Sequence, residues 1–393
     1  MSNRRSFLTQ AGGALAVLGL GVRSLLAQLK PPYVMESAPG TETMINGKKY
    51  LYFGGTGYYT LQNHPALLKS AAEALEKYGM HSATSRNLYG TTPLSLGVEK
   101  RAAEFFGTED AVYIASGYLS NIAGLQALAP RIDAVFLDED SHYSVADFAG
   151  LGGKAVYPFA HRDPEDLGKK LRANLQPRQR PLILTDGIFP TFGHIAPVRQ
   201  YLDVAQDYEP FMWLDDAHSV GVLGENGRGT YEHFALKSER LLFGGTFSKA
   251  FGAHGGVVPG SQSFIELIRA GHVMNGATSP TSPAAASALM SLELLSKHPE
   301  MRAQLWKNAK TLKAGLSRLG IPTEDTVVPV AAWATKTSQE MDRVHQGLMQ
   351  KGIAIQRTHY VGSGAEGALR VVVFSTHTAE QINRLLEELG KLV

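Results

Sequence analysis

The stretch FMWLDDAH, residues 211–218, places two aspartates and a histidine directly after a continuous apolar run. Four similar apolar runs occur elsewhere in the chain: AVYI (111–114), DAVFL (133–137), PLILT (181–185) and LLFGG (241–245). Stretches with helical spacing separate most of these runs, for example YLSNIAGLQALA (118–129) and PVRQYLDVAQDY (197–208). Short strands without polar alternation, separated by helices, indicate a buried and mostly parallel sheet covered on both faces. We therefore predict a large α/β domain.

The pattern changes after about residue 283. Two long helical segments, 284–297 and 301–320, precede three further apolar runs, which are VVPVAAW (327–333), IAIQ (353–356) and LRVVVF (369–374). This order favours a smaller C-terminal α+β domain. We divide the chain into residues 1–27, an N-terminal arm over 28–60, a large α/β domain over 61–282 and a small domain over 283–393.

The composition excludes several classes of protein. Of the 393 residues, 44% are hydrophobic and 19% are charged, which excludes an intrinsically disordered chain. Lys+Arg 38 against Asp+Glu 36 leaves no basic surplus, so we expect no nucleic-acid partner. Cysteine is absent, which excludes disulfides, thiolate metal sites and a cysteine nucleophile. The histidines lack metal-ligand spacing such as His-Glu-x-x-His, so we expect no metal site.

Residues 1–27 resemble a twin-arginine export signal. Arg4 and Arg5 precede Ser-Phe-Leu, a mildly apolar run over 11–22, and Ala27 near a candidate cleavage point. This run is well below the ~20 residues that span a bilayer, so we expect no stable membrane span. A functional signal would place the protein in the periplasm or outside the cell. A frayed amphipathic N-terminus is the alternative, and the protein would then be cytoplasmic.

Unusual polar residues follow four of the predicted strands, and ligands gather at such carboxyl ends in open α/β sheets. A helix start binds phosphate, a carboxylate keeps a pyridine nitrogen protonated, and a buried amine forms a Schiff base with an aldehyde. These are the groups needed to hold pyridoxal 5'-phosphate, and the sequence therefore predicts this cofactor. The residues are Ser116, Gly117 and Tyr118; His142; Asp215 and His218; and Thr246, Ser248 and Lys249.

Two segments then make the chain resemble a known family. LDDAHSVGVLGENGRG (214–229) and GTFSKAFGAHGG (245–256) are similar to signature segments of the α-oxoamine synthase group, within the class-II aminotransferases. Asp215 in the first segment and Lys249 in the second are 34 residues apart. The resemblance implies the fold type I of pyridoxal-phosphate-dependent transferases and a homodimer with each site at the subunit boundary.

The resemblance also implies roles for individual residues. Lys249 matches the Schiff-base lysine and proton shuttle, Asp215 the acid on the pyridine nitrogen, His218 the group that hydrogen bonds the ring oxygen, and His142 the imidazole stacked on the ring. The remaining matches are Ser116, Gly117 and Tyr118 at the phosphate turn; Thr246 and Ser248, which add hydroxyls to the phosphate; Thr278 and Ser279, from the second subunit; Asp186 beside the cofactor; and Arg370, which holds the substrate α-carboxylate.

The sequence departs from the family on the side that faces the substrate. Thr56 stands where the family has an asparagine, and Pro190 to Gly193 replace a Ser-Met-Asp-Gly stretch. The resemblance implies carbon–carbon condensation of an α-amino acid with an acyl thioester such as acyl-CoA. Transamination, racemisation, decarboxylation and aldol-type cleavage need the same constellation and stay open, as does a binding protein that merely retains the cofactor. The G-x-G-x-x-G at 362–367 precedes a strand-like run rather than a helix, which disfavours dinucleotide binding.

Overall fold

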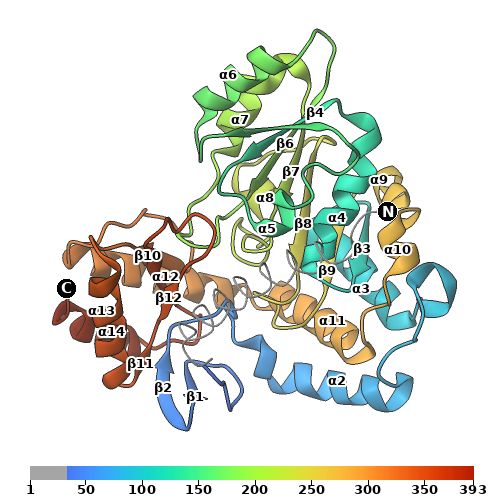
Figure 1. Cartoon of the computed structure of the whole chain (residues 1–393). Helices are drawn as coiled ribbons and strands as arrows, with labels where there is room; N and C mark the ends of the chain where they lie inside the picture. Colours follow the sequence, from blue (N-terminus) through green and yellow to red (C-terminus); the bar gives the residue numbers. More distant parts are fainter. Residues whose placement is uncertain (1–32) are drawn as a thin grey trace, which may run out of the picture.

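A seven-stranded sheet forms the centre of the large domain in the computed structural model, which describes residues 33–393 (Figure 1). The export signal expected at 1–27 therefore lies outside the described residues. The strand order is β3-β9-β8-β7-β6-β4-β5. The strands span Asp110–Ile114 (β3), Ala134–Asp138 (β4), Ala155–Phe159 (β5), Pro181–Asp186 (β6), Phe211–Asp215 (β7), Leu241–Thr246 (β8) and Gly256–Gly260 (β9).

The sheet is mostly parallel, as predicted. From β5 to β8 every neighbouring pair is parallel, and β9 runs antiparallel between β3 and β8. The carboxyl ends of β3, β4, β6, β7 and β8 therefore lie at one edge of the sheet. The polar residues singled out in the sequence follow four of these ends, so the topology brings them together.

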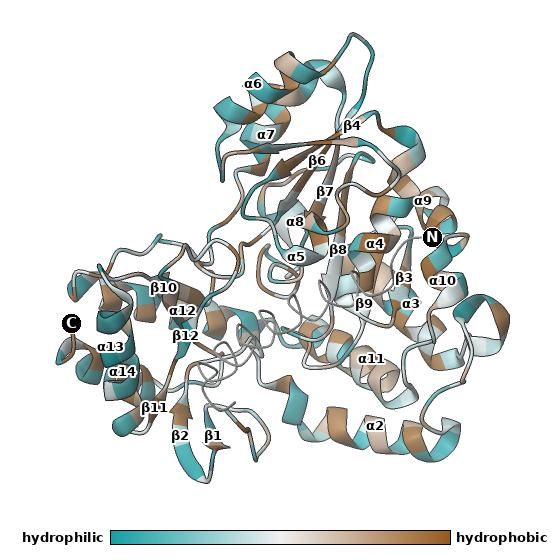
Figure 2. Ribbon diagram, in the orientation of Figure 1, coloured by the Kyte–Doolittle hydropathy of each residue, from teal (hydrophilic) through white to brown (hydrophobic). Residues whose placement is uncertain are grey.

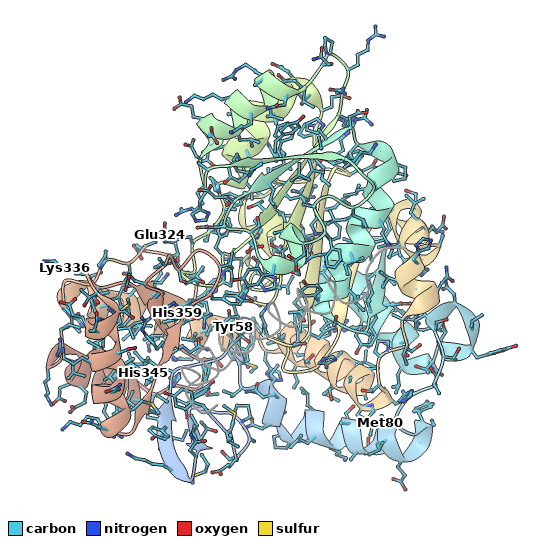
Figure 3. All side chains as sticks on the ribbon, in the orientation of Figure 1. Tyr58, Met80, Glu324, Lys336, His345 and His359 are labelled. Atoms are coloured by element: carbon cyan, nitrogen blue, oxygen red, sulfur yellow. The ribbon has the colours of Figure 1, made fainter. Side chains whose placement is uncertain are left out.

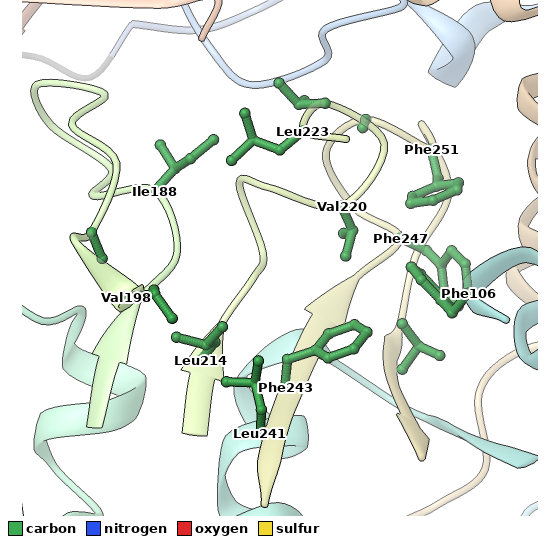
Figure 4. Close-up of a cluster of buried hydrophobic side chains, with 14 of the residues drawn as sticks. Phe106, Ile188, Val198, Leu214, Val220, Leu223, Leu241, Phe243, Phe247 and Phe251 are labelled. Atoms are coloured by element: carbon green, nitrogen blue, oxygen red, sulfur yellow. The ribbon is translucent and has the colours of Figure 1, made fainter. Parts of the chain in front are cut away.

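The central strands are largely apolar, as their brown colour in Figure 2 shows, and buried hydrophobic clusters lie on both faces of the sheet. In β7, Met212 and Leu214 face one hydrophobic cluster, and Phe211 and Trp213 face the other, because successive side chains alternate across a strand. Figure 4 shows part of the first cluster, which contains Phe243. The large-domain helices span Pro65–Tyr78 (α2), Pro93–Phe106 (α3), Gly117–Leu128 (α4), Tyr143–Ala146 (α5), Pro164–Asn174 (α6), Val198–Ala205 (α7), Thr230–His233 (α8), Gln262–Arg269 (α9), His272–Gly276 (α10) and Ser282–Lys297 (α11).

The small domain contains two three-stranded sheets, β10-β13-β12 and β1-β2-β11. The N-terminal arm supplies β1 and β2, and Leu51 and Phe53 enter the same core as Val371. The elements span Glu42–Ile45 (β1), Lys48–Tyr52 (β2), Pro299–Arg318 (α12), Val330–Trp333 (β10), Ser338–Gln350 (α13), Ile353–Ala354 (β11), Gln356–Thr358 (β12), Ala368–Val372 (β13) and Ala379–Gly390 (α14). Among the described residues, no helix is both long and apolar enough to cross a bilayer.

The two hydrophobic cores meet within α12. Helix α11 packs against α2 and α3, and its Leu292 lies in the core of the large domain. In α12, Leu305 belongs to that same core, whereas Leu312 and Leu316 belong to the core of the small domain. This helix therefore contributes side chains to both cores.

Close packing of α4 on the sheet gives a testable prediction about stability. A Cβ atom on Gly124 would lie 1.9 Å from Cη2 of the fully buried Trp213. We expect Gly124→Ala to destabilise the protein by at least about 1–3 kcal/mol, because the core has no room for another carbon. Urea denaturation measures this effect.

The matched control is Gly97→Ala in α3, where the added Cβ would lie at an ordinary 3.4 Å from Leu289. A helix-interior alanine there should be neutral or stabilising by about 0.5–1 kcal/mol. Equal stability of the two variants would contradict the packing argument.

Candidate active site

A cavity of about 230 Å³ opens at the carboxyl ends of the parallel strands. Most of its lining was expected from the sequence, whereas Ser144, Ile188 and Ala217 were not. The expected residues that line it are Ser116, Gly117, Tyr118, His142, Asp186, Asp215, His218, Thr246, Ser248 and Lys249. Segments that are separated by more than a hundred residues thus meet in one polar cavity.

Asp215, the last residue of β7, is buried and accepts three hydrogen bonds. Its Oδ2 accepts from Asn121 Nδ2 at 2.7 Å and from Ser144 Oγ at 3.1 Å, and its Oδ1 accepts from the backbone N–H of Ala217 at 3.0 Å. Donors of this kind stabilise the ionised form of a carboxylate. Asp215 therefore has the surroundings of an anion that receives a cationic partner from the cavity.

Lys249 follows β8 and is only partly accessible from the cavity. Burial lowers the pKa of its amine, Arg370 lowers it further, and Asp215 and Asp186 act in the opposite direction. Among residues 33–393, no side chain forms an ion pair or hydrogen bond with its Nζ. A lowered pKa makes the neutral, nucleophilic form of an amine more accessible, and a lysine without a partner can receive an aldehyde from the cavity.

His218 is buried on the wall of the same cavity and contacts Tyr58, which lies where the two domains meet (Figure 3). Its Nδ1 is 2.7 Å from the Tyr58 hydroxyl. Burial raises the pKa of Tyr58 to about 12 and lowers that of His218 well below its usual range. A protonated phenol and a neutral imidazole therefore share this hydrogen bond.

His142 connects the large domain to the small one. Its Nε2 is 2.6 Å from the Tyr360 hydroxyl, and its Nδ1 is 2.6 Å from Ser144 Oγ. Its backbone N–H donates to both oxygens of Asp186 at 3.2 Å. Burial lowers the pKa of His142, and burial together with the nearby Asp215 raises the pKa of Asp186 well above its usual range. Asp186 thus orients the histidine through its backbone.

The N-terminus of α4 forms the opposite end of the cavity. Ser116 caps the helix by accepting from the Leu119 N–H at 3.3 Å, which leaves the N–H groups of Gly117 and Tyr118 at the free end. A Cβ atom on Gly117 would lie 2.6 Å from Cβ of Thr246, so only glycine lets α4 approach β8 this closely. Thr246 donates its hydroxyl hydrogen to Gly255 O at 3.0 Å, which leaves Ser248 as the exposed hydroxyl.

Four expected site residues lie outside this lining. Arg370, on β13, is buried and donates from Nε to Pro190 O at 2.9 Å and from Nη1 to Gln356 Oε1 at 2.5 Å. Its Nη1 also reaches Gly55 O at 3.3 Å, next to the partly buried Thr56. Thr278 is exposed and bridges to Ser85, while Ser279 Oγ donates to Gly90 O at 2.8 Å.

This arrangement fits pyridoxal phosphate, the cofactor expected from the sequence. A helix start suits the phosphate, a buried carboxylate suits the pyridine nitrogen, and a lysine that has a lowered pKa and no partner suits the aldehyde. Within residues 33–393, no three histidine, aspartate or glutamate side chains are grouped as a metal ion would require. The glycine-rich turn at 362–367 connects β12 to β13, and neither a strand-to-helix transition nor a cavity lining places it in a nucleotide site.

Comparison with known proteins agrees with this geometry. The family model described as "Aminotransferase class I and II" matches residues 50–389. The chain belongs to this family. A serine palmitoyltransferase of Sphingobacterium spiritivorum is 33% identical to this chain over 373 residues. The match covers 94% of this chain and 92% of the relative. An 8-amino-7-oxononanoate synthase of Alkaliphilus oremlandii is 33% identical over 362 residues, 91% of each chain.

Solved structures of the family show the same fold. Serine palmitoyltransferase from S. paucimobilis with a bound PLP–myriocin aldimine has a TM-score of 0.88 and 29% identity, and the match covers 96% of each chain. The enzyme from Sphingomonas wittichii has a TM-score of 0.87 and 28% identity, again over 96% of each chain. The expected fold and the resemblance to the α-oxoamine synthase group are both confirmed.

Proposed function

We propose that this protein is a pyridoxal-phosphate-dependent acyltransferase that condenses an α-amino acid with an acyl thioester. The observation that carries the proposal is Lys249, an amine without a partner in a cavity that the triply hydrogen-bonded Asp215 also lines. Further support comes from relatives that match over nine tenths of their length and are named serine palmitoyltransferase and 8-amino-7-oxononanoate synthase.

The chain's own residues suit such a reaction. When bound, pyridoxal phosphate supplies an electron-accepting ring that stabilises negative charge at the Cα atom of an amino acid. Asp215 would hold a proton on the ring nitrogen, and the imidazole of His218 would hydrogen bond the ring oxygen. Nζ of Lys249 would take a proton from Cα and return it later. His142 would lie against the ring and limit the access of water to it.

Arg370 is proposed to hold the α-carboxylate of the amino acid. Its Nε and Nη1 are occupied by Pro190, Gly55 and Gln356, whereas Nη2 has no hydrogen-bond partner among the described residues. A buried guanidinium that is fixed by its other nitrogens presents a preorganised donor to a carboxylate.

Replacing Arg370 by alanine is therefore expected to raise KM for the amino acid by about 10- to 100-fold, which is the value of one or two charge-assisted hydrogen bonds. KM for the acyl thioester should change little. Initial rates at varied amino acid concentration measure the effect. Arg357→Ala on the neighbouring β12 is the control, since Arg357 is paired with Asp342 at 3.2 Å. Equal effects of both substitutions would remove Arg370 from the carboxylate site.

The function is tested by incubating purified holoprotein with a panel of amino acids, with and without acyl-CoA of graded chain length. Mass spectrometry should detect an amino ketone, with release of free CoA, only when both substrates are present. Amino acid conversion to a keto acid without acyl-CoA would instead assign an aminotransferase. Absence of any conversion, with the cofactor bound, would favour a binding protein.

We also propose that the protein acts as a homodimer. In this dimer, the loop that contains Thr278 and Ser279 would approach the phosphate of the pyridoxal phosphate bound to the second subunit. In support, Thr278 is exposed, and Leu88 and Tyr89 on the adjacent segment are 70% and 92% exposed. Sedimentation analysis should give twice the monomer mass, and Thr278→Ala should weaken cofactor binding only in the dimer.

A further inference from the structure

Asn121 occupies the centre of a buried hydrogen-bond network beneath the cavity. It lies one turn into α4 and is 1% exposed. Its Nδ2 donates to Asp215 Oδ2 at 2.7 Å and to Ser144 Oγ at 2.8 Å, and its Oδ1 accepts from Trp213 Nε1 at 2.8 Å. The side-chain amide thus uses both of its N–H groups and its oxygen.

Trp213 fixes which way this amide points. An indole nitrogen can only donate, so the atom of Asn121 that faces it must be the oxygen. The amide nitrogen must then face the Asp215 carboxylate. Trp213 and Asp215 are two residues apart in β7, so they project from the same face of the sheet. Strand β7 therefore provides both Asp215 and Trp213, the residue that orients the amide of Asn121 towards Asp215.

The network matters because Asp215 has acidic neighbours. Asp186 at the end of β6 and the adjacent Asp216 both interact with its charge, and repulsion between such groups favours protonation of one of them. Lys249, across the cavity, acts in the opposite direction but is itself shifted towards its neutral form. Hydrogen bonds from Asn121 and Ser144 hold the Asp215 carboxylate in place among these charged groups.

We propose that Asn121 is a positioning residue, oriented by Trp213, that fixes the Asp215 carboxylate in the orientation needed to meet the pyridine nitrogen. This inference rests on the proposed function, because it requires pyridoxal phosphate in the cavity. Ser144 extends the network, since its Oγ contacts Asp215 Oδ2 at 3.1 Å and His142 Nδ1 at 2.6 Å. The Asp215 carboxylate and the His142 imidazole are thereby linked through one hydroxyl.

The test measures pyridoxal phosphate binding to apoprotein, independently of any reaction. Asn121→Ala should lower the affinity by about 10- to 100-fold, the range for one hydrogen bond to a charged group. Asn121→Asp should lower it further, because its second oxygen would lie against Asp215, and lowering the pH should restore part of that loss. Trp213→Phe removes only the orienting N–H and should give a smaller loss in the same direction.

Asn308→Ala is the matched control. Asn308 is also buried, and its Nδ2 donates to the backbone carbonyls of Phe374 and His377 at 2.8 and 2.9 Å, away from the cavity. This variant should melt at a lower temperature yet bind pyridoxal phosphate within about twofold of the parent protein. The pH dependence of the bound cofactor's absorbance should shift in Asn121→Ala and stay unchanged in Asn308→Ala.

The outcomes separate the two proposals. A parent protein that binds no pyridoxal phosphate overturns both. A parent protein that binds it normally, with unchanged affinity and pH profile in Asn121→Ala, overturns only the role of Asn121. Equal losses in the Asn121 and Asn308 variants would reduce Asn121 to a structural residue and overturn the inference as well.

Discussion

Lys249→Ala is expected to abolish turnover, with a loss of at least about 10⁴-fold, because one substitution removes both the nucleophile and the proton carrier. The cavity is otherwise unchanged, so folding and non-covalent cofactor binding should persist. Steady-state rates, the absorbance of the bound cofactor and circular dichroism measure the three properties. Borohydride reduction of the parent protein followed by peptide mapping should place the label on Lys249.

Lys313→Met is the control for this substitution. Lys313 is also a buried lysine, and its Nζ donates to Thr326 Oγ1 at 2.5 Å in the small domain, outside the cavity. This variant should retain the covalent label and its activity. A label that persists in Lys249→Ala, or that maps to another peptide, would invalidate the site assignment.

Asp215→Asn should reduce kcat by about 10²–10³-fold, the usual effect of removing one preorganised electrostatic group from an active site. The asparagine has nearly the same shape but cannot hold a proton on the ring nitrogen, so electron withdrawal from Cα weakens. Cofactor attachment to Lys249 should persist, which distinguishes this variant from Lys249→Ala. Single-turnover kinetics with the amino acid alone would isolate the proton-abstraction step.

The adjacent Asp216→Asn provides the comparison. Asp216 is fully buried and accepts from the Thr230 hydroxyl at 2.6 Å and the Thr230 N–H at 2.9 Å, and it does not line the cavity. We expect this substitution to lower thermal stability and to leave kcat within a few fold. Similar losses of kcat in both variants would show that Asp215 has no special part in the chemistry.

The sequence predicts most of the sheet because its buried strands are continuous apolar runs. All five of the runs quoted from the large domain form strands at or within one residue of the expected positions. Strand β9, GVVPG, was missed, since its glycines and proline are typical of a loop, although it lies between β3 and β8. The N-terminal arm joins β11 through a parallel pairing of Leu51 with Ile353, which are about 300 residues apart. No local sequence pattern predicts such a pairing.

The candidate site was predicted where a residue directly follows a strand and matches the family's segments. Tyr58, Asn121 and Tyr360 were missed, because each acts through a contact with a residue distant in sequence: His218, Asp215 and His142. Asn121 sits in an ordinary apolar helix, and only its position one turn after Ser116 and Gly117 offered a hint. The roles of Thr278 and Ser279 stay predictions, since they require a second subunit.

The wall of the cavity comes entirely from residues 116–249, whereas the guanidinium of Arg370 is held by carbonyls at Gly55 and Pro190 and by Gln356. Substitutions next to the arginine would therefore leave the residues that line the cavity unchanged. We therefore expect sequence variation among relatives to be greater around Arg370 than in the lining of the cavity. Substrate specificity could then change in single steps, because each intermediate protein would still bind the cofactor.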